Sequence, residues 1–190
     1  MSQRQALRRH FRAERRALPS AAQQQHAQAI ARALRLSDEV ANAQTIGLYW
    51  SADGEVDLAP LVTSLDPGKQ LALPVVSAKG QMDFYRYHPG DALAPNRFQI
   101  PEPRPQAGLV QGNELDLLLI PLVAFDASGT RLGMGAGYYD RYLGALPAAE
   151  RPYTIGIAHQ VQRSDEPLPS AAWDVALDAV ITEAGWQLRG

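Results

Sequence analysis

The segment from Arg131 to Asp140, Arg-Leu-Gly-Met-Gly-Ala-Gly-Tyr-Tyr-Asp, has three glycines at alternate positions between an arginine and a carboxylate. Glycine allows a backbone to approach a ligand closely and to adopt positive φ angles. Backbone N–H groups in such a loop, together with those at the start of a following helix, can bind an anion. The glycine spacing matches neither the Rossmann fingerprint nor the P-loop. Two interpretations therefore stay open, a phosphate-binding loop and a tight loop that simply requires glycines.

The charged residues at the two ends of this segment bear on that choice. Arg131 precedes the glycines, and a guanidinium suits phosphate oxygens, which supports the phosphate interpretation. Asp140 follows the loop and could simply interact favourably with the dipole of the next helix. If phosphates bind to the loop, the same carboxylate is well placed for Mg²⁺, which is usually held by one or two carboxylates plus phosphate oxygens.

The first sixteen residues contain six arginines and one glutamate. Arg4, Arg8, Arg12 and Arg15 share one face of a predicted helix. This face could be a solvated charged surface, a clamp on an anionic substrate, or a nucleic-acid contact. The overall net charge of −2 and the lack of aromatic residues on that face disfavour nucleic acid.

Two further residues could contact a ligand: Trp50 at the end of the first predicted strand and Glu55 shortly after it. Glu55 is a candidate polar contact, although a loop carboxylate in water is an equally good interpretation. Trp50 could belong to the core or form a flat wall for an aromatic ligand.

Residue patterns for common hydrolytic chemistry are lacking. The four histidines, His10, His26, His88 and His159, are scattered, and none pairs at metal-ligand spacing. No Gly-x-Ser-x-Gly nucleophile elbow occurs. We therefore expect neither zinc-dependent hydrolysis nor serine-type acyl chemistry.

The composition is that of one globular domain over residues 1–190, with 46% hydrophobic and 20% charged residues. The lack of cysteine rules out disulfides, thiolate zinc sites and a cysteine nucleophile, and it fits a reducing compartment. No apolar run approaches the roughly 20 residues that span a bilayer, and the charged N-terminus has no signal-peptide core. We expect a cytoplasmic monomer without a membrane or nucleic-acid partner.

Elements that could position these residues follow from hydrophobic periodicity and turn signals. Helices are expected at 3–17, 20–36, 57–65 and 138–146, and strands at 45–50, 70–76, 82–87, 153–158 and 176–181. A further buried strand is expected in the apolar run that begins after Asp116, and ordered loops at 88–113 and 159–173. Two N-terminal helices followed by alternating strands and helices predict an α/β fold. Its mostly parallel sheet would be flanked by helices on both faces, in a Rossmann-like three-layer arrangement.

The run from Pro121 to Asp140, Pro-Leu-Val-Ala-Phe-Asp-x-x-Gly-x-Arg-Leu-Gly-x-Gly-x-Gly-Tyr-Tyr-Asp, resembles the signature of the 5-formyltetrahydrofolate cyclo-ligase family. Shorter similarities are spread along most of the chain. They are Arg4-x-x-Leu7-Arg8, Glu55-Val56-Asp57, Gly68-Lys69, Leu73-Pro74, Ile100-Pro101-Glu102-Pro103, Leu168-Pro169 and Trp173-Asp174.

The resemblance implies a reaction. The family uses ATP and Mg²⁺ to convert 5-formyltetrahydrofolate to 5,10-methenyltetrahydrofolate through a phosphorylated formyl group, an imidate phosphate, and releases ADP and phosphate. Such phosphoryl transfer needs positioning and charge neutralisation rather than a protein nucleophile. The backbone N–H groups, arginines and carboxylate found above suit that need.

The resemblance also implies residue roles. The ATP contacts would be Arg4, Arg8, Arg131, Leu132, Gly133, Met134, Gly135, Ala136, Gly137, Tyr138, Tyr139 and Gln162. The folate contacts would be Arg8, Trp50, Glu55, Met134, Gly135, Ala136, Gly137 and Tyr138. Arg131, Tyr138 and Tyr139 would act on the reacting groups, and Asp140 and Asp174 would hold Mg²⁺.

Two positions depart from the family pattern. Arg4 stands where the family usually has lysine, and its planar fork has a different reach. Ala136 stands where some relatives carry lysine, which removes one phosphate contact. Two other classes of function stay open. One is an ATP-independent sugar-phosphate isomerase or acyl-transfer enzyme on a similar scaffold, and the other is a non-catalytic protein that binds folate, nucleotide or nucleic acid.

Overall fold

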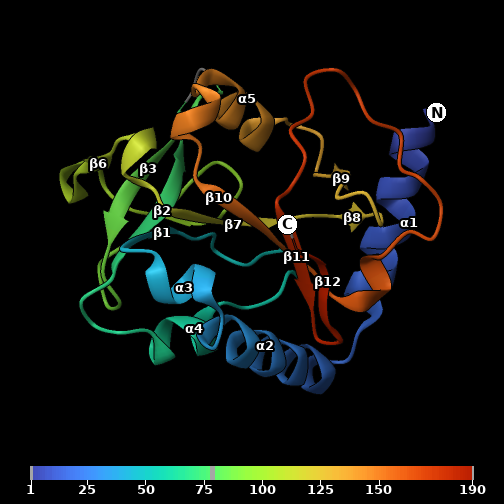
Figure 1. The fold of residues 1–190 in the computed structure, drawn as a ribbon, viewed down its shortest axis with the longest axis horizontal. Coiled ribbons are helices and arrows are strands. Elements are labelled where there is room, and N and C mark those ends of the chain that lie inside the picture. The colour runs from blue at the N-terminus through green and yellow to red at the C-terminus, as the bar shows by residue number, and fades with distance from the viewer. Residues whose placement is uncertain (1, 78–79, 190) are drawn as a thin grey trace.

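Five parallel strands, with antiparallel strands at both edges, form the central sheet of the computed structural model, which describes residues 2–77 and 80–189 (Figure 1). Its strands are β1 (Thr45–Gly47), β2 (Gln70–Val76), β3 (Met82–Tyr87), β6 (Leu109–Val110), β7 (Leu117–Pro121), β10 (Tyr153–Ile157), β11 (Ala179–Thr182) and β12 (Gly185–Arg189). Their order across the sheet is β12-β11-β10-β7-β1-β2-β3-β6, and β2–β3, β3–β6 and β11–β12 are the antiparallel pairs. The predicted mostly parallel sheet is confirmed. Of the domain expected over residues 1–190, positions 1, 78, 79 and 190 lie outside the described residues.

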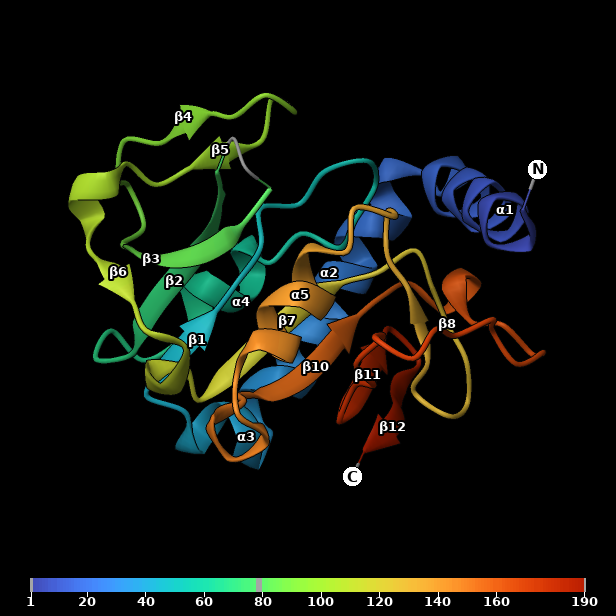
Figure 2. The ribbon, with the colours of Figure 1, turned by 90° about the horizontal axis from the view of Figure 1, so that it is seen from above.

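Helices lie on both faces of the sheet (Figures 1 and 2). They are α1 (Gln3–Ala17), α2 (Ser20–Arg35), α3 (Asp38–Asn42), α4 (Ala59–Ser64) and α5 (Tyr138–Ala145), with short 3₁₀ turns η1 (Pro105–Ala107), η2 (Gly112–Glu114), η3 (Ala148–Glu150) and η4 (Gln160–Gln162). α2, α3 and α4 cover one face and α5 covers the other, so the three-layer α/β prediction is confirmed. In the described part of the chain, no helix is long and apolar enough to cross a bilayer.

The central strand β7 shows why the layers pack. Leu117 and Leu119 belong to the core beneath α2 and α4, whereas Leu118 and Ile120 belong to the core beneath α5. Successive side chains of a strand point to opposite faces, so a strand covered on both sides must be apolar throughout. All four side chains are fully buried, and the predicted buried strand is confirmed.

Helix α1 lies apart from the two helical layers, beyond the carboxyl ends of the parallel strands (Figure 1). Its Leu7 and Phe11, one turn apart, pack against Val123, Leu132 and Leu168. These partners come from the segments that follow β7 and β10. The packing therefore holds the arginine-rich helix next to the loops at the end of the sheet where ligands bind in open α/β folds.

Several elements differ from the sequence-based expectation. The first strand ends at Gly47, and residues 48–58 form a loop that brings Trp50 to the surface. A short helix, α3, follows the two expected N-terminal helices, because Ser37 caps it by accepting a hydrogen bond from the Val40 N–H. The expected strand at 176–181 is β11, and it turns at Gly185, which has φ 102°, into the unpredicted antiparallel β12.

The expected surface loop 88–113 contains short strands. Besides β6, it forms the hairpin of β4 (Ala94–Pro95) with β5 (Pro101–Glu102). The Asn96 side chain stabilises this hairpin: it donates to Glu102 and accepts from the backbone of Ile100.

Candidate active site

Three loops meet at the carboxyl ends of the parallel strands (Figure 2). They follow β1 (residues 48–58), β7 (122–137) and β10 (158–178), and α1 crosses them. Within the second loop, β8 (Ala124–Phe125) pairs with β9 (Arg131–Leu132), and the glycine-rich residues 133–137 then lead into α5. The topology thus brings together most of the candidate residues named from the sequence.

Two glycines of this loop have backbone conformations that other residues rarely adopt. Gly135 has φ 108°, and Gly137, the residue before α5, has φ 66°. A Cβ atom at position 135 would lie 3.3 Å from Cζ of Arg8. The positive φ angles favour glycine at both positions, and at position 135 the lack of a side chain also leaves room for Arg8 of α1. This observation is compatible with either interpretation of the loop.

Two guanidinium groups hold the loop by its carbonyl oxygens. Arg8 donates from Nε to the Gly133 oxygen at 2.8 Å, and Arg141 donates from Nη1 to the Ala136 oxygen at 2.7 Å. The Met134 side chain between them is half exposed. The first N–H groups of a helix have no partner within the helix, so the start of α5 has donors available next to an exposed loop. The arrangement suits an anionic ligand.

Arg131 is buried under the loop and paired with Asp140. Its Nη2 donates to Asp140 Oδ1 at 2.6 Å, and its Nη1 donates to the carbonyl oxygen of Val175. Asp140 Oδ1 also accepts from the Val175 N–H at 3.2 Å. Burial lowers the pKa of the Arg131 guanidinium, and the neighbouring Asp140 and Asp174 carboxylates oppose that shift. Both predicted magnesium ligands therefore lie near the same buried cation.

Arg4 and Asp174 form a second arginine–carboxylate pair. Arg4 donates from Nη2 to Asp174 Oδ2 at 3.0 Å, and the Ala171 N–H donates to the same oxygen at 2.8 Å. The Nε of Arg4 is buried and has no hydrogen-bond partner among the residues that the structure describes. Burial and the nearby Arg4 lower the pKa of Arg8, while Asp174 raises it. The two arginines thus form a positive cluster, in which Arg4 Nε is a buried donor without a partner among the described residues.

The carboxylates fit a magnesium ion by their chemistry. The hydrogen bonds given above reach Oδ1 of Asp140 and Oδ2 of Asp174, so each carboxylate has a second oxygen available. Mg²⁺ prefers oxygen ligands and is usually bound by one or two carboxylates plus phosphate. Asp140 and Asp174, which both lie near Arg131, have the oxygen atoms that such a site requires.

The other two arginines of the predicted face have a structural role. Arg12 forms two hydrogen bonds with the Asp53 carboxylate, at 2.9 and 3.1 Å. The fully buried Arg15 donates to Asp53 Oδ2 at 2.7 Å and to the Leu122 carbonyl oxygen at 3.0 Å. Arg15 therefore ties the loop after β1 to the loop after β7. Of the other two, Arg8 is bonded to the glycine loop and Arg4 is paired with Asp174.

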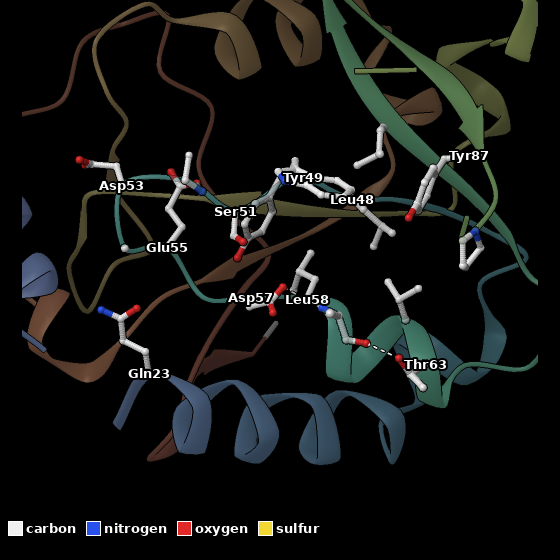
Figure 3. Close-up of a pocket in the computed structure, with 17 residues that line it drawn as sticks. Gln23, Leu48, Tyr49, Ser51, Asp53, Glu55, Asp57, Leu58, Thr63 and Tyr87 are labelled. Carbon is white, nitrogen blue, oxygen red and sulfur yellow. Dashed lines mark hydrogen bonds between the residues drawn. The ribbon is translucent and has the colours of Figure 1, made fainter. Parts of the chain in front are cut away.

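A pocket of about 660 Å³ opens beside the loop after β1 (Figure 3). Trp50, Glu55, Asp57 and Tyr87 are among the residues that line it. Glu55 accepts a hydrogen bond from the Ala52 N–H at 3.0 Å, and burial raises the pKa of its carboxyl group. Of the residues predicted to contact the folate, Trp50 and Glu55 line this pocket. Those at 134–137 lie on the glycine loop, Tyr138 begins α5, and Arg8 lies on α1.

Tyr139, in the first turn of α5, packs against the core beneath that helix and is close enough to Glu55 and Arg131 to feel their charges. Burial raises the pKa of its hydroxyl, the Glu55 carboxylate raises it further, and the Arg131 guanidinium lowers it. The phenol thus stays protonated and can donate a hydrogen bond. Tyr138 points elsewhere: its hydroxyl accepts from Arg97 Nη2 at 2.8 Å, and the Arg141 guanidinium lies 5.3 Å from its ring centre.

Two of the predicted ATP contacts are enclosed by protein. The buried Gln162 amide donates to the carbonyl oxygens of Leu122 and Val123 and accepts from the His159 N–H. The Leu132 side chain is fully buried in the core with α1. Gln162 therefore supports the loop after β7, and Leu132 could contact a ligand through its backbone alone.

The fold brings together two histidines that the sequence spacing does not pair. His26 on α2 and His159 after β10 face each other, with 2.9 Å between their Nδ1 atoms, and Glu183 lies beside them. They are 133 positions apart in sequence, so only the fold could bring them together. The Arg15–Asp53 pair was likewise missed; its one sequence signal is an aspartate before glycine in a loop, where a positive φ is tolerated, and Asp53 has φ 54°.

Comparison with known proteins places these observations in one family. The sequence model of the 5-formyltetrahydrofolate cyclo-ligase family matches residues 1–183. The chain is 39% identical over 176 residues to the 5-formyltetrahydrofolate cyclo-ligase of Escherichia coli K12, covering 90% of this chain and 96% of that protein. The Haemophilus influenzae protein of the same name is 39% identical over 179 residues, covering 92% and 94%. The solved structure of Aquifex aeolicus 5,10-methenyltetrahydrofolate synthetase matches with a TM-score of 0.86 at 31% identity, covering 99% of this chain and 93% of that one.

Proposed function

Because the chain belongs to the 5-formyltetrahydrofolate cyclo-ligase family, it is a ligase of folate one-carbon metabolism, and we propose that it converts 5-formyltetrahydrofolate to 5,10-methenyltetrahydrofolate with ATP and Mg²⁺. The observation that carries the proposal is the glycine loop at the start of α5, flanked by the pairs Arg131–Asp140 and Arg4–Asp174. This site combines hydrogen-bond donors for phosphate, positively charged arginines and carboxylates suited to magnesium.

The phosphates of ATP bind to the glycine loop. Backbone N–H groups of residues 133–139 and the guanidinium groups of Arg4 and Arg8 neutralise their charge. The buried, unpaired Nε of Arg4 supports this assignment, because such a donor costs free energy until an acceptor reaches it. Asp140 and Asp174 would hold Mg²⁺, which neutralises the charge that develops on the transferring phosphate when it is bound.

The folate occupies the pocket beside β1. Trp50 offers an aromatic face that is 40% exposed, and Glu55 offers a largely buried hydrogen-bond acceptor. The pocket volume of about 660 Å³ lies within the range of roughly 300–1,000 Å³ that is typical for small-molecule sites. Tyr139 is near both Glu55, which lines this pocket, and Arg131, which lies beneath the loop, and we place the meeting point of the two substrates there.

The chemistry proceeds in two displacements. The formyl oxygen attacks the γ-phosphorus, so an O–P bond forms, the bond to ADP breaks, and the formyl group becomes an imidate phosphate. The side-arm nitrogen of the folate then attacks the formyl carbon and loses its proton, and inorganic phosphate leaves with the former formyl oxygen. Arg131 and Tyr139 orient the reacting groups, because effective positioning and charge neutralisation are what this transfer requires.

An absorbance assay for methenyltetrahydrofolate tests the proposal, with purified protein and 5-formyltetrahydrofolate in the presence or absence of ATP and Mg²⁺. Product should form only when both are present, with one ADP released for each product. Product that forms without ATP would contradict the proposed ligase mechanism. Failure of the folded protein to bind either ATP or folate would favour the alternative of a different substrate.

We propose further that the protein acts as a cytoplasmic monomer. The arginines, carboxylates and loop that form the site all come from one chain, so a second copy is not required to complete it. Sedimentation velocity across a range of protein concentrations would show a single species with the mass of one chain. A dimer whose dissociation abolishes activity would contradict this.

A further inference from the structure

Three side chains from distant segments meet outside the proposed active site. His26 lies on α2, His159 follows β10, and Glu183 lies in the turn between β11 and β12. The Nδ1 atoms of the two histidines are 2.9 Å apart, and His26 Nδ1 is 3.5 Å from Glu183 Oε1. One ligand atom from each residue lies within 4.8 Å of the others. We propose that these three residues form a binding site for one Zn²⁺ ion.

The distances match the geometry that Zn²⁺ requires. Zinc is bound by histidine nitrogen at about 2.0–2.1 Å and by carboxylate oxygen at about 2.0–2.2 Å in tetrahedral sites, so neighbouring donor atoms lie roughly 3.3 Å apart. The observed separations of 2.9 and 3.5 Å lie on either side of this value. Two imidazoles and one carboxylate are a common set of three protein ligands, with a fourth position left for water.

His159 and Glu183 are each held by a hydrogen bond through the atom that would not bind the metal. His159 Nε2 lies 3.2 Å from the Gly54 carbonyl oxygen, so Nε2 carries the proton and the lone pair of Nδ1 points toward His26. Glu183 Oε2 accepts from the Gln160 N–H at 3.0 Å, which leaves Oε1 for the metal. Such outer contacts orient histidine and carboxylate ligands in known metal sites and are needed for full affinity.

The site has an entry path and a structural consequence. The side chains of His26 and Glu183 are each 19% exposed, whereas His159 is fully buried, so an ion could enter from the side of α2. A bound ion would join α2 to the ends of β10 and β11. Through the Gly54 contact it would also fix the loop that carries Asp53 and Glu55. This site does not depend on the proposed ligase activity.

Isothermal titration of the metal-free full-length protein with Zn²⁺ tests the proposal, in buffer with millimolar Mg²⁺ so that the carboxylates of the active site are occupied. One Zn²⁺ should bind per chain, and Co²⁺ bound at the same site should show the intense visible absorption of tetrahedral coordination. Zinc should also raise the thermal midpoint of the protein, because an ion that binds only the folded state stabilises it.

Variants identify the ligands. His26→Gln and Glu183→Gln should each weaken zinc binding by at least about tenfold, as even outer-shell changes do. The matched control His10→Gln, at an exposed histidine on α1, should bind zinc like the unmodified protein. Circular dichroism without metal checks that each variant is folded. Zinc binding that is unchanged in a folded His26→Gln protein would overturn the proposal. The lack of any binding at micromolar zinc would overturn it too, because the cluster would then be only a hydrogen bond between two histidines.

Discussion

Arg8 donates a hydrogen bond of 2.8 Å from Nε to the carbonyl oxygen of Gly133, so helix α1 is bonded directly to the glycine loop. The Nη1 atom of Arg8 lies beside Gly135, 3.5 Å from where a Cβ atom at that position would be, and Gly135 is exposed. Arg8 therefore both shapes the loop and presents positive charge where the phosphates of ATP are proposed to bind.

We predict that Arg8→Ala lowers kcat/KM for ATP by at least about a hundredfold, since charge-assisted hydrogen bonds to phosphate and the shape of the loop are lost together. The thermal midpoint should change little, because Arg8 is partly exposed and outside the core. Steady-state kinetics with varied ATP measures the effect. The exposed neighbour Arg9→Ala is the control, and an equal loss in both variants would argue against a specific role for Arg8.

Gly135 and Gly144 provide a matched pair of substitutions. Gly135→Ala places a side chain at φ 108° and 3.3 Å from the Arg8 guanidinium carbon, which should distort the loop at a cost of about 1–3 kcal/mol and lower activity. Gly144→Ala adds a methyl group within α5, with nothing within 4 Å, and should stabilise the protein by about 0.5–1 kcal/mol. Urea unfolding should therefore show a loss of stability in Gly135→Ala and a gain in Gly144→Ala, whereas the ATP-dependent assay should show a loss of activity in Gly135→Ala alone. Full activity of Gly135→Ala would show that the positive φ is not needed.

The magnesium ligands can be tested by the metal requirement. Asp140→Asn should raise the Mg²⁺ concentration for half-maximal activity by about tenfold or more, because an amide is a weaker ligand than a carboxylate for this ion. Its oxygen can still accept from Arg131 and Val175, so folding should be retained. Asp165→Asn, at an exposed position, serves as the control. An unchanged Mg²⁺ dependence in Asp140→Asn would remove this residue from the metal site.

Asp53 should be important for stability rather than for catalysis. It is the shared anion for Arg12 and the fully buried Arg15, and a buried charge that loses its partner costs about 3–5 kcal/mol. Asp53→Ala should therefore lower the free energy of unfolding by that amount. Arg12→Ala should cost only about 1 kcal/mol, because the Arg12 side chain is 37% exposed. Equal losses in the two variants would contradict the assigned role of Arg15.

The same contacts give stability a pH dependence. The hydrogen bond from Arg12, and then that from Arg15, hold the pKa of Asp53 below its usual value, although burial opposes them. Since the folded-state pKa is lower than the unfolded one, the contribution of Asp53 is present above about pH 4 and is lost as the pH falls through the folded-state pKa. The difference in unfolding free energy between the unmodified protein and Asp53→Asn should accordingly shrink between pH 7 and pH 3. A constant difference would show that ionisation of Asp53 is irrelevant.

Glu55 presents the opposite case. Burial raises the pKa of its carboxyl group, so its stabilising contribution exists only below the unfolded-state pKa and is lost as the pH rises through the folded-state value. We predict that Glu55→Gln increases the unfolding free energy at pH 7 by up to about 1 kcal/mol and weakens folate use by about tenfold. Thermal denaturation and folate titrations measure the two effects, with the exposed Glu166→Gln as control. A variant that is both less stable and fully active would contradict this assignment.

The sequence predicts the layers of the fold because they depend on local patterns. The all-apolar run at 117–120 indicates a strand covered on both faces, and the glycines and Asp140 mark the loop and the following helix. β12 and the short strands within 88–113 were not predicted, since their pairing depends on partners elsewhere in the sheet rather than on their own hydrophobic period.

For the site, the sequence identified residue types, and only the fold decides which of them meet. Arg4, Arg8, Arg12 and Arg15 look equivalent on a helical face. In the fold, however, Arg8 is bonded to the glycine loop, Arg4 is paired with Asp174, and the other two are paired with Asp53. The pairing depends on a loop 38–41 positions away in sequence. His26 and His159 show the same limit, because their contact requires α2 to pack beside the end of β10.

The most direct test of the proposed mechanism follows the formyl oxygen. With 5-formyltetrahydrofolate labelled with ¹⁸O in the formyl group, attack of that oxygen on ATP requires the label to leave with phosphate. Mass spectrometry of the phosphate released in the ATP-dependent reaction should therefore find one ¹⁸O atom for each methenyltetrahydrofolate formed. Phosphate without the label, with ¹⁸O recovered in water, would contradict the phosphorylated intermediate and with it the role proposed for the glycine loop.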